Sequence, residues 1–108
     1  MASTPEKKVK EKVVAVLKME EVYYFFPATH GYGRSGVPDI IACVNGHFLG
    51  IECKANGNKP TALQIREIER IHASGGAAIV VDDTNWHRVI DVVRELKDTV
   101  IIDKEWGS

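Results

Sequence analysis

Residues 36–54, GVPDIIACVNGHFLGIECK, decide the fold of this chain. Two apolar runs flank Asn45 and Gly46. Asn-Gly between such runs is the strongest short-range signal for a β-hairpin, because both turn positions need positive φ. A two-residue turn pairs Val44 with His47 and fixes the register of the whole hairpin.

The same register places two acidic residues side by side. Asp39 lies directly opposite Glu52, as a non-hydrogen-bonded pair whose side chains are close together. Lys54 falls on the same strand face as Glu52. Each residue alone fits an ordinary hairpin with solvated charged ends. Together they favour a cation between the carboxylates or a raised pKa on one of them, and Mg2+ or Mn2+ accepts such oxygen ligands.

Apolar residues on both faces of the hairpin predict central strands that are covered on each side. Cys43 and Cys53 lie on opposite faces, which argues against a disulfide, and we expect both to be small buried residues. No Cys/His spacing predicts a zinc site.

Upstream of the hairpin we expect a helix and a strand. Thr4 is a candidate N-cap for an amphipathic helix over residues 5–20, with Pro5 at its first position. Residues 22–27, VYYFFP, predict a strand that ends at Pro27.

Downstream, Thr61 to Gln64 fits a capping box that opens a helix. Ile65, Ile68 and Ile71 continue this helix at a spacing of three until Gly75 and Gly76 end it. The strand that follows, residues 77–81, completes a β-α-β unit.

A last helix is expected beyond that strand. Thr84 or Asn85 is its candidate cap, and Val89, Val93 and Leu96 are its apolar stripe. Residues 100–102 are a candidate final edge strand, and Trp106 a candidate packing residue of the tail.

Length and composition set the class. With 108 residues, 44% of them apolar, and a net charge of −1, we expect one soluble domain over residues 1–108. No stretch predicts a membrane span or a signal peptide, so we expect a protein of the cytoplasm, with no membrane partner. Residues 1–60 hold eight Lys/Arg against six Asp/Glu. With so small an excess of positive charge, a protein that binds DNA would need a local basic surface, extended by a second subunit.

The glycine-rich stretch 28–36 precedes the candidate site. Arg34 and Ser35 are its candidate substrate-binding residues, because a loop with these groups suits contact with phosphate. An interpretation of this stretch as a plain connecting loop without a functional role is equally supported.

Pro38-Asp39, followed by Glu52-Cys53-Lys54 after twelve residues, resembles the signature of PD-(D/E)xK nucleases. Residues 36–41, residues 48–54 and the helix that contains Gln64 together resemble a more specific family, the VRR-NUC domain. This resemblance spans about residues 6–81. It implies an α/β fold with a restriction-endonuclease-like core, in which helices flank a central mixed sheet.

The resemblance also implies roles. Asp39 and Glu52 would bind Mg2+ or Mn2+ with the main-chain carbonyl of Cys53, and Lys54 would orient or activate the attacking water. The resemblance also implies that Gln64 and an acidic residue of the first helix belong to the catalytic residues. Glu6 best matches that acid, and Glu11 is the alternative. Without the resemblance, Glu6 is a favourable charge at a helix N-terminus and Glu11 a solvated residue.

The function expected from this resemblance is a metal-dependent, structure-selective DNA endonuclease, acting on branched DNA such as Holliday junctions as a homodimer, in a bacterial or phage-infected cell. The alternatives are a nicking or restriction-type endonuclease, a catalytically idle nucleic-acid-binding subunit, and a structural or protein-interaction domain.

Overall fold

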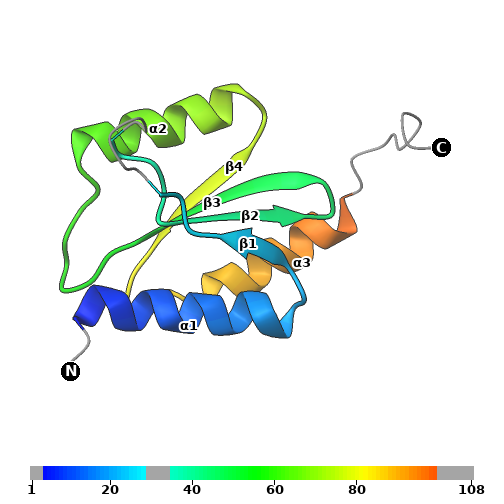
Figure 1. The fold of residues 1–108 in the computed structure, drawn as a ribbon, viewed down its shortest axis with the longest axis horizontal. Helices are drawn as coiled ribbons and strands as arrows, with labels where there is room; N and C mark the ends of the chain where they lie inside the picture. Colours follow the sequence, from blue (N-terminus) through cyan, green and yellow to red (C-terminus); the bar gives the residue numbers. More distant parts are fainter. Residues whose placement is uncertain (1–3, 29–34, 100–108) are drawn as a thin grey trace.

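The computed structural model describes residues 4–28 and 35–99 (Figure 1). Its four strands form one mixed sheet in the order β1-β2-β3-β4. The strands are β1 (Tyr23–Phe25), β2 (Ile40–Val44), β3 (His47–Cys53) and β4 (Ala77–Val81), and the helices are α1 (Pro5–Met19), α2 (Ala62–Ala73) and α3 (Arg88–Asp98). The expected α/β architecture of helices around a central mixed sheet is confirmed.

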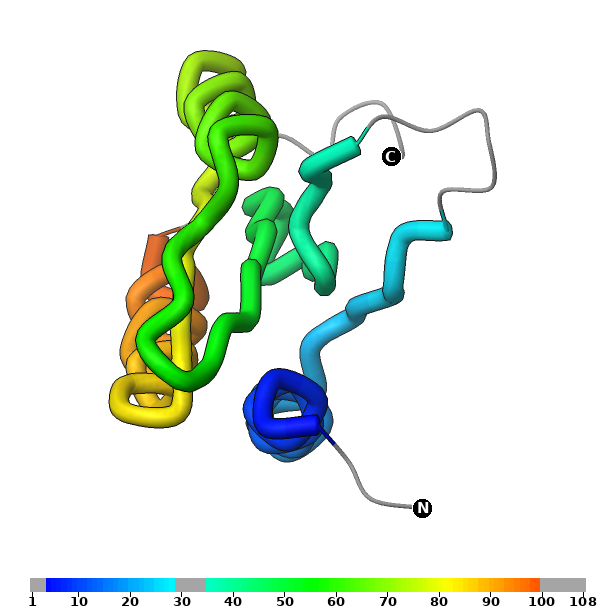
Figure 2. The backbone as a smooth tube through the Cα atoms, turned by 90° about the vertical axis from the view of Figure 1, so that its left-hand side faces the viewer, coloured from blue at the N-terminus to red at the C-terminus, as the bar shows by residue number. Residues whose placement is uncertain are grey.

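The helices cover the two faces of the sheet unequally. α1 and α3 pack on one face, and α2 lies on the other, mainly against β4 (Figures 1 and 2). Within residues 4–28 and 35–99, no helix is long and apolar enough to cross a membrane.

The hairpin has the register that its turn predicts. Asn45 and Gly46 have φ values of 53° and 88°. Val44 pairs with His47 at the turn, and Ile40 pairs with Ile51 at the far end. Because every pair keeps this register, Asp39 stands one step beyond the last pair, at the level of Glu52.

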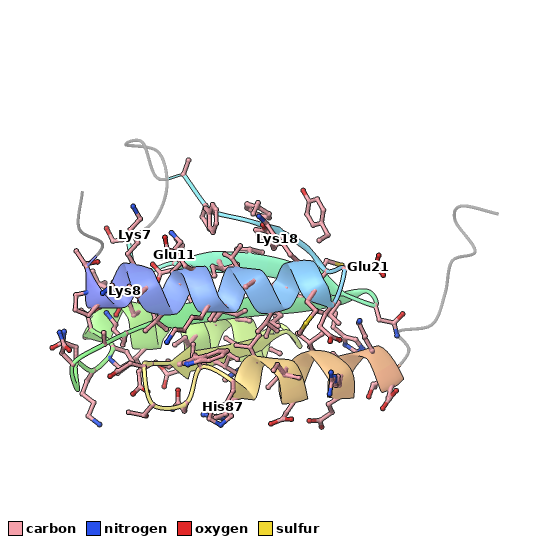
Figure 3. All side chains as sticks on the ribbon, turned by 90° about the horizontal axis from the view of Figure 1, so that it is seen from below. Lys7, Lys8, Glu11, Lys18, Glu21 and His87 are labelled. Atoms are coloured by element: carbon pink, nitrogen blue, oxygen red, sulfur yellow. The ribbon has the colours of Figure 1, made fainter. Side chains whose placement is uncertain are left out.

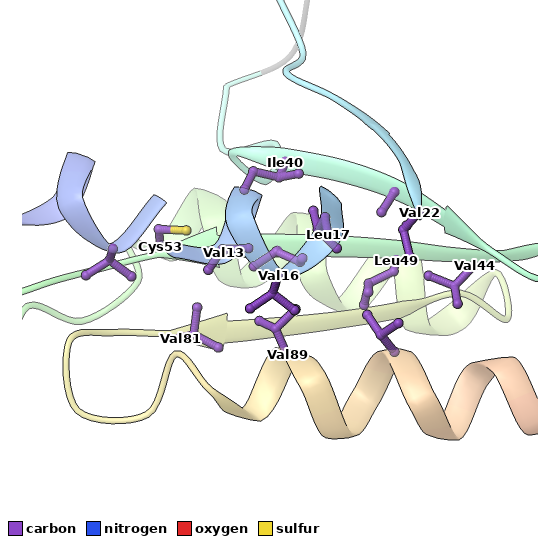
Figure 4. Packing of buried hydrophobic residues seen from close by; sticks show 14 of the residues in the cluster. Val13, Val16, Leu17, Val22, Ile40, Val44, Leu49, Cys53, Val81 and Val89 are labelled. Atoms are coloured by element: carbon purple, nitrogen blue, oxygen red, sulfur yellow. The ribbon is translucent and has the colours of Figure 1, made fainter. Parts of the chain in front are cut away.

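The core lies between the sheet and the pair of helices α1 and α3 (Figure 4). One face of the hairpin is fully buried there, as the alternation predicts, and its residues are Ile40, Ala42, Val44, Leu49, Ile51 and Cys53. α1 adds Leu17 and three valines, and α3 adds Val89 and Val93. Burial of each Val, Leu or Ile side chain in this core stabilises the fold by about 1.5–3 kcal/mol.

The β-α-β unit is confirmed, with β3 and β4 parallel. α2 begins with the predicted capping box, in which Thr61 N donates to Gln64 Oε1 at 2.8 Å and Gln64 N donates to Thr61 Oγ1 at 3.2 Å. Gly50 allows Pro38 and α2 to approach β3 closely, because an added Cβ would lie 2.8 Å from Pro38 Cγ.

The cover on the α2 face stops short of the hairpin turn. Tyr23 pairs with Cys43, and Cys43 pairs with Phe48, in one row across three strands. Cys43 is exposed, and Tyr23 and Phe48 are 69% and 43% exposed. The prediction that Cys43 is buried is therefore wrong, because α2 packs over β4 and leaves this row open.

On α2, Glu67 is turned inward, whereas Ile65 is 46% exposed. The expected cap of the last helix needs correction. Neither Thr84 nor Asn85 caps α3, which begins at Arg88 without a side-chain cap. Both residues stabilise the preceding turn instead, where Asp82 Oδ1 accepts from Thr84 N and Asp82 N donates to Asn85 Oδ1.

The outer elements agree with their patterns. α1 starts after Thr4, whose side chain accepts from Lys7 N, and ends before Glu20. β1 is shorter than expected, at three residues. The expected edge strand at 100–102 and Trp106 lie outside the described residues.

Candidate active site

Asp39 is fixed to β3 by its side chain. Its Oδ2 accepts a hydrogen bond of 2.9 Å from the backbone N–H of Cys53. The strand pairing ends at Ile40 and Ile51, so this carboxylate replaces a main-chain partner just beyond the last pair. Asp39 is thereby held at the end of β3, beside the residue that follows Glu52.

Glu52 is a buried carboxylate held from the α2 side. Its exposed fraction is 2%. Oε2 accepts from Gln64 Nε2 at 2.8 Å and lies 3.5 Å from Lys54 Nζ. Oε1 is buried and has no hydrogen-bond partner among the described residues. A buried acceptor without a donor is costly, which makes this oxygen a candidate ligand atom.

The pKa of Glu52 reflects this environment. Burial raises it from 4.5 to about 7, and the negative charge of Asp39 is the next largest cause of the rise. Lys54 opposes both effects with its positive charge. Because the pKa of Glu52 stays raised even beside Lys54, joint ionisation of the two carboxylates is disfavoured, and a further cation near them would relieve this.

Lys54 extends β3 beyond its last residue. Its backbone N–H donates to Val81 O at 2.9 Å, so the main chain here is fixed against the end of β4. The residue is only 9% exposed. The ammonium group is thus positioned beside Glu52 by the sheet itself.

Gln64 joins the helix cap to the site. Its Oε1 accepts the Thr61 N–H and its Nε2 donates to Glu52. The cap fixes the orientation of the amide, because an oxygen is needed at the Thr61 N–H. The nitrogen must then face the carboxylate.

Gly36 brings the loop before Asp39 against the start of α2. Its φ is +86°, and an added Cβ would lie 2.6 Å from the carbonyl of Leu63 and 2.9 Å from Gln64 N. Only glycine tolerates both the conformation and the contact. Neither interpretation of the glycine-rich stretch 28–36, as a substrate-binding loop or as a plain connector, identified this packing role.

A cavity of about 700 Å3 opens beside Asp39, on the side of α1. Asp39 and Cys53 line one part of it, and residues of α1 line the rest. Both candidate acids of the first helix, Glu6 and Glu11, lie on this wall. The negative charge of Glu6 is one of the causes that raise the pKa of Glu52. Glu6 is therefore favoured over Glu11 as the candidate acid of the first helix.

The structure thus brings Asp39, Glu52, Cys53, Lys54 and Gln64 together, with Glu6 across the cavity. Ser35 is exposed on the loop before Gly36, and Arg34 lies outside the described residues.

Sequence reasoning missed three lysines, Lys7, Lys10 and Lys18, that line the same cavity. Their spacing along one side of a helix was the available signal.

The donors at this site are oxygens. Among residues 4–28 and 35–99, no group of three or more His, Cys, Asp or Glu side chains forms a ready ligand cluster. Two carboxylates and a main-chain carbonyl suit a hard divalent cation that keeps part of its water shell.

Comparisons with known proteins identify a sequence relative and solved structures of the same fold. No protein-family model matches the chain. It is 39% identical over 85 residues to "Putative nuclease p44" of Acyrthosiphon pisum secondary endosymbiont phage 1, covering 78% of this chain and 88% of the relative.

Two solved structures have the same fold. One, a "VRR_NUC domain", superposes with a TM-score of 0.68 at 23% identity over 85% of this chain and 97% of its own. The other, a "VRR_NUC domain protein", has a TM-score of 0.72 at 22% identity over 95% of this chain and 96% of its own.

Proposed function

Because this chain belongs to the VRR-NUC family of nucleases, we propose that it is a metal-dependent, structure-selective DNA endonuclease that hydrolyses phosphodiester bonds. The observation that carries the proposal is the buried Glu52, whose Oε1 lacks a hydrogen-bond donor among the described residues. Asp39 and Lys54 are its charged neighbours.

The proposed cofactor is Mg2+ or Mn2+. Asp39, Glu52 and the main-chain carbonyl of Cys53 would hold it, and water would complete the shell. The partnerless Oε1 and the raised pKa of Glu52 support this assignment, since a cation relieves both. When bound, such an ion polarises a phosphoryl oxygen and lowers the pKa of a coordinated water.

The protein groups supply orientation and charge. Lys54 places an ammonium 3.5 Å from Glu52 Oε2, where it orients the attacking water and offsets negative charge in the transition state. Gln64 keeps Glu52 in one orientation, and Glu6 supplies an acid from the opposite wall of the cavity. No covalent enzyme intermediate is required.

The proposed substrate is branched DNA such as a Holliday junction. The described part of each chain brings together one set of Asp39, Glu52 and Lys54, whereas a four-way junction needs two symmetric cuts. A two-fold homodimer would supply both sites.

The test is cleavage of synthetic four-way junctions, flaps and duplexes with Mg2+ or Mn2+. We expect metal-dependent cutting of branched substrates, and a rate at least about 100-fold lower in Asp39→Asn and Lys54→Ala. Asp91→Asn, an exposed change on α3, is the matched control and should retain activity. Absence of cutting on every substrate, or full activity in the site variants, would refute the proposal. Light scattering of the full chain tests the dimer.

A further inference from the structure

The cavity beside Asp39 continues along α1, and we name this part, lined by Lys7, Lys10, Lys18 and Phe26, the α1 groove. The three lysines recur at intervals that place them on one side of a helix. Figure 3 shows Lys7 and Lys18 along the same side of α1. At 1.5 Å per residue they span about 16 Å, the length of several nucleotides of one strand.

An aromatic ring also lines the α1 groove. Phe26 is 49% exposed, and Lys10 Nζ lies 4.4 Å from the centroid of its ring. Tyr24 contacts the Phe26 ring edge-on, with centroids 5.9 Å apart, which fixes its orientation. Exposed rings beside cationic side chains are the elements with which proteins bind unpaired bases and their phosphates.

Charge along the cavity changes sign. Its acidic part holds Glu6 and Asp39, and the remainder holds the lysines with Glu11 among them. A divalent cation at Asp39 would offset the acidic part. A phosphate at Asp39 and phosphates further along the same strand would then each face positive charge.

We propose that the α1 groove binds an unpaired nucleic-acid strand next to the scissile phosphate, with Lys10 and Lys18 on its backbone and Phe26 stacked on a base. This inference rests on the proposed function and adds the path of the substrate strand. An unpaired strand fits better than a duplex because a base can stack on Phe26 only after it leaves its own helix.

The test measures binding of labelled dT12, a blunt duplex and a flap with a single-stranded arm, by fluorescence anisotropy in Ca2+ with intact probes verified on gels. We expect Lys10→Ala/Lys18→Ala to weaken binding of dT12 and the flap at least about tenfold, and to reduce the salt slope by about 1.4. Lys8→Ala/Lys12→Ala is the matched control, because it removes the same charge from the same helix outside the groove. It should change affinity less than twofold.

The aromatic contact is tested separately. Phe26→Ala should weaken binding of dT12 and the flap about tenfold while leaving the duplex unchanged. Phe25→Ala is its control, since Phe25 is similarly exposed but does not line the groove. Thermal melting checks that every variant is folded.

The outcomes separate this inference from the proposed function. Equal weakening by the two lysine pairs, or an unchanged affinity of Phe26→Ala for dT12, overturns the groove even if the wild type cleaves DNA. Groove-dependent binding of dT12 by a wild type that cleaves nothing supports the groove and refutes the nuclease.

Discussion

Gln64 Nε2 donates a hydrogen bond of 2.8 Å to Glu52 Oε2, while the same amide closes the cap of α2. One side chain therefore serves the stability of a helix and the geometry of the site. The two roles are separable, because Thr61 takes part in the cap and makes no hydrogen bond to Glu52.

Thr61→Ala should lower the free energy of unfolding by about 1 kcal/mol and leave the cleavage rate nearly unchanged. Gln64→Ala should cost similar stability and also lower the rate about tenfold, because Glu52 loses the donor that orients it. Urea unfolding and single-turnover cleavage measure the two effects. Equal rates in the two variants would show that Gln64 acts only as a cap.

The raised pKa of Glu52 predicts how stability of the metal-free protein depends on pH. Since the folded-state pKa is about 7 and the ordinary value is 4.5, the folded state binds the extra proton between these values. Stability should fall as pH rises from about 4.5 to 7, by up to about 3 kcal/mol. Urea unfolding in EDTA measures this. Glu52→Gln should flatten the dependence, and a wild type that gains stability across this range would contradict it.

The affinity for Mn2+ should depend on the ionisation of Glu52. The ion requires Glu52 without its proton, so affinity should decrease as pH falls below about 7, with proton release on binding. Calorimetry in buffers of different ionisation enthalpy detects that proton. Asp39→Asn should weaken binding at least about tenfold, whereas Asp91→Asn should match the wild type. A pH-independent affinity would remove Glu52 from the ligand set.

The two cysteines should differ in reactivity. Cys43 is exposed, whereas Cys53 is buried and burial raises the pKa of its thiol to about 12. A thiol reagent such as DTNB should therefore modify one cysteine per native chain and two after unfolding in urea, because the thiolate is the reactive form. Cys43→Ser should abolish the native reaction. Rapid modification of two thiols in the folded chain would contradict the burial of Cys53.

Gly36→Ala should destabilise the fold and the site together. The new Cβ would meet the backbone of Leu63 at 2.6 Å, in addition to the strain of a φ of +86°. Gly57→Ala is the matched control, because Gly57 has a φ of +74° with no atom within 4 Å of an added Cβ. We expect a loss of about 1 kcal/mol in the control and clearly more in Gly36→Ala, measured by urea unfolding. Similar losses would mean that the loop relaxes away from α2 freely.

The parts of the fold that local chemistry determines were predictable. Asn45-Gly46 set the hairpin register, and Thr61 with Gln64 set the start of α2, because both signals act within a few residues. The exposure of Cys43 and Ile65 was not predictable, because it depends on where α2 lies on the sheet. Alternation shows which residues share a face, but not how far a helix covers that face.

The site shows the same division. The position of Asp39 opposite Glu52 follows from the register of the hairpin. The hydrogen bond between Asp39 and Cys53 N does not follow from the register, because this bond depends on where the strand pairing ends. The hydrogen bond from Gln64 to Glu52 was not predictable either. It forms because the connection from β3 to α2 places the first turn of α2 beside the end of β3.

The bond between Asp39 and Cys53 N has a further consequence, for the entropy of ligand binding. A free aspartate loses rotamer freedom when it binds an ion, and that loss weakens the affinity. Here the backbone of β3 already holds Asp39, and Gln64 holds Glu52. The ordering of both carboxylates is thus part of folding. The cation proposed for this site would therefore meet preorganised ligands, and its affinity would depend directly on the integrity of the end of β3.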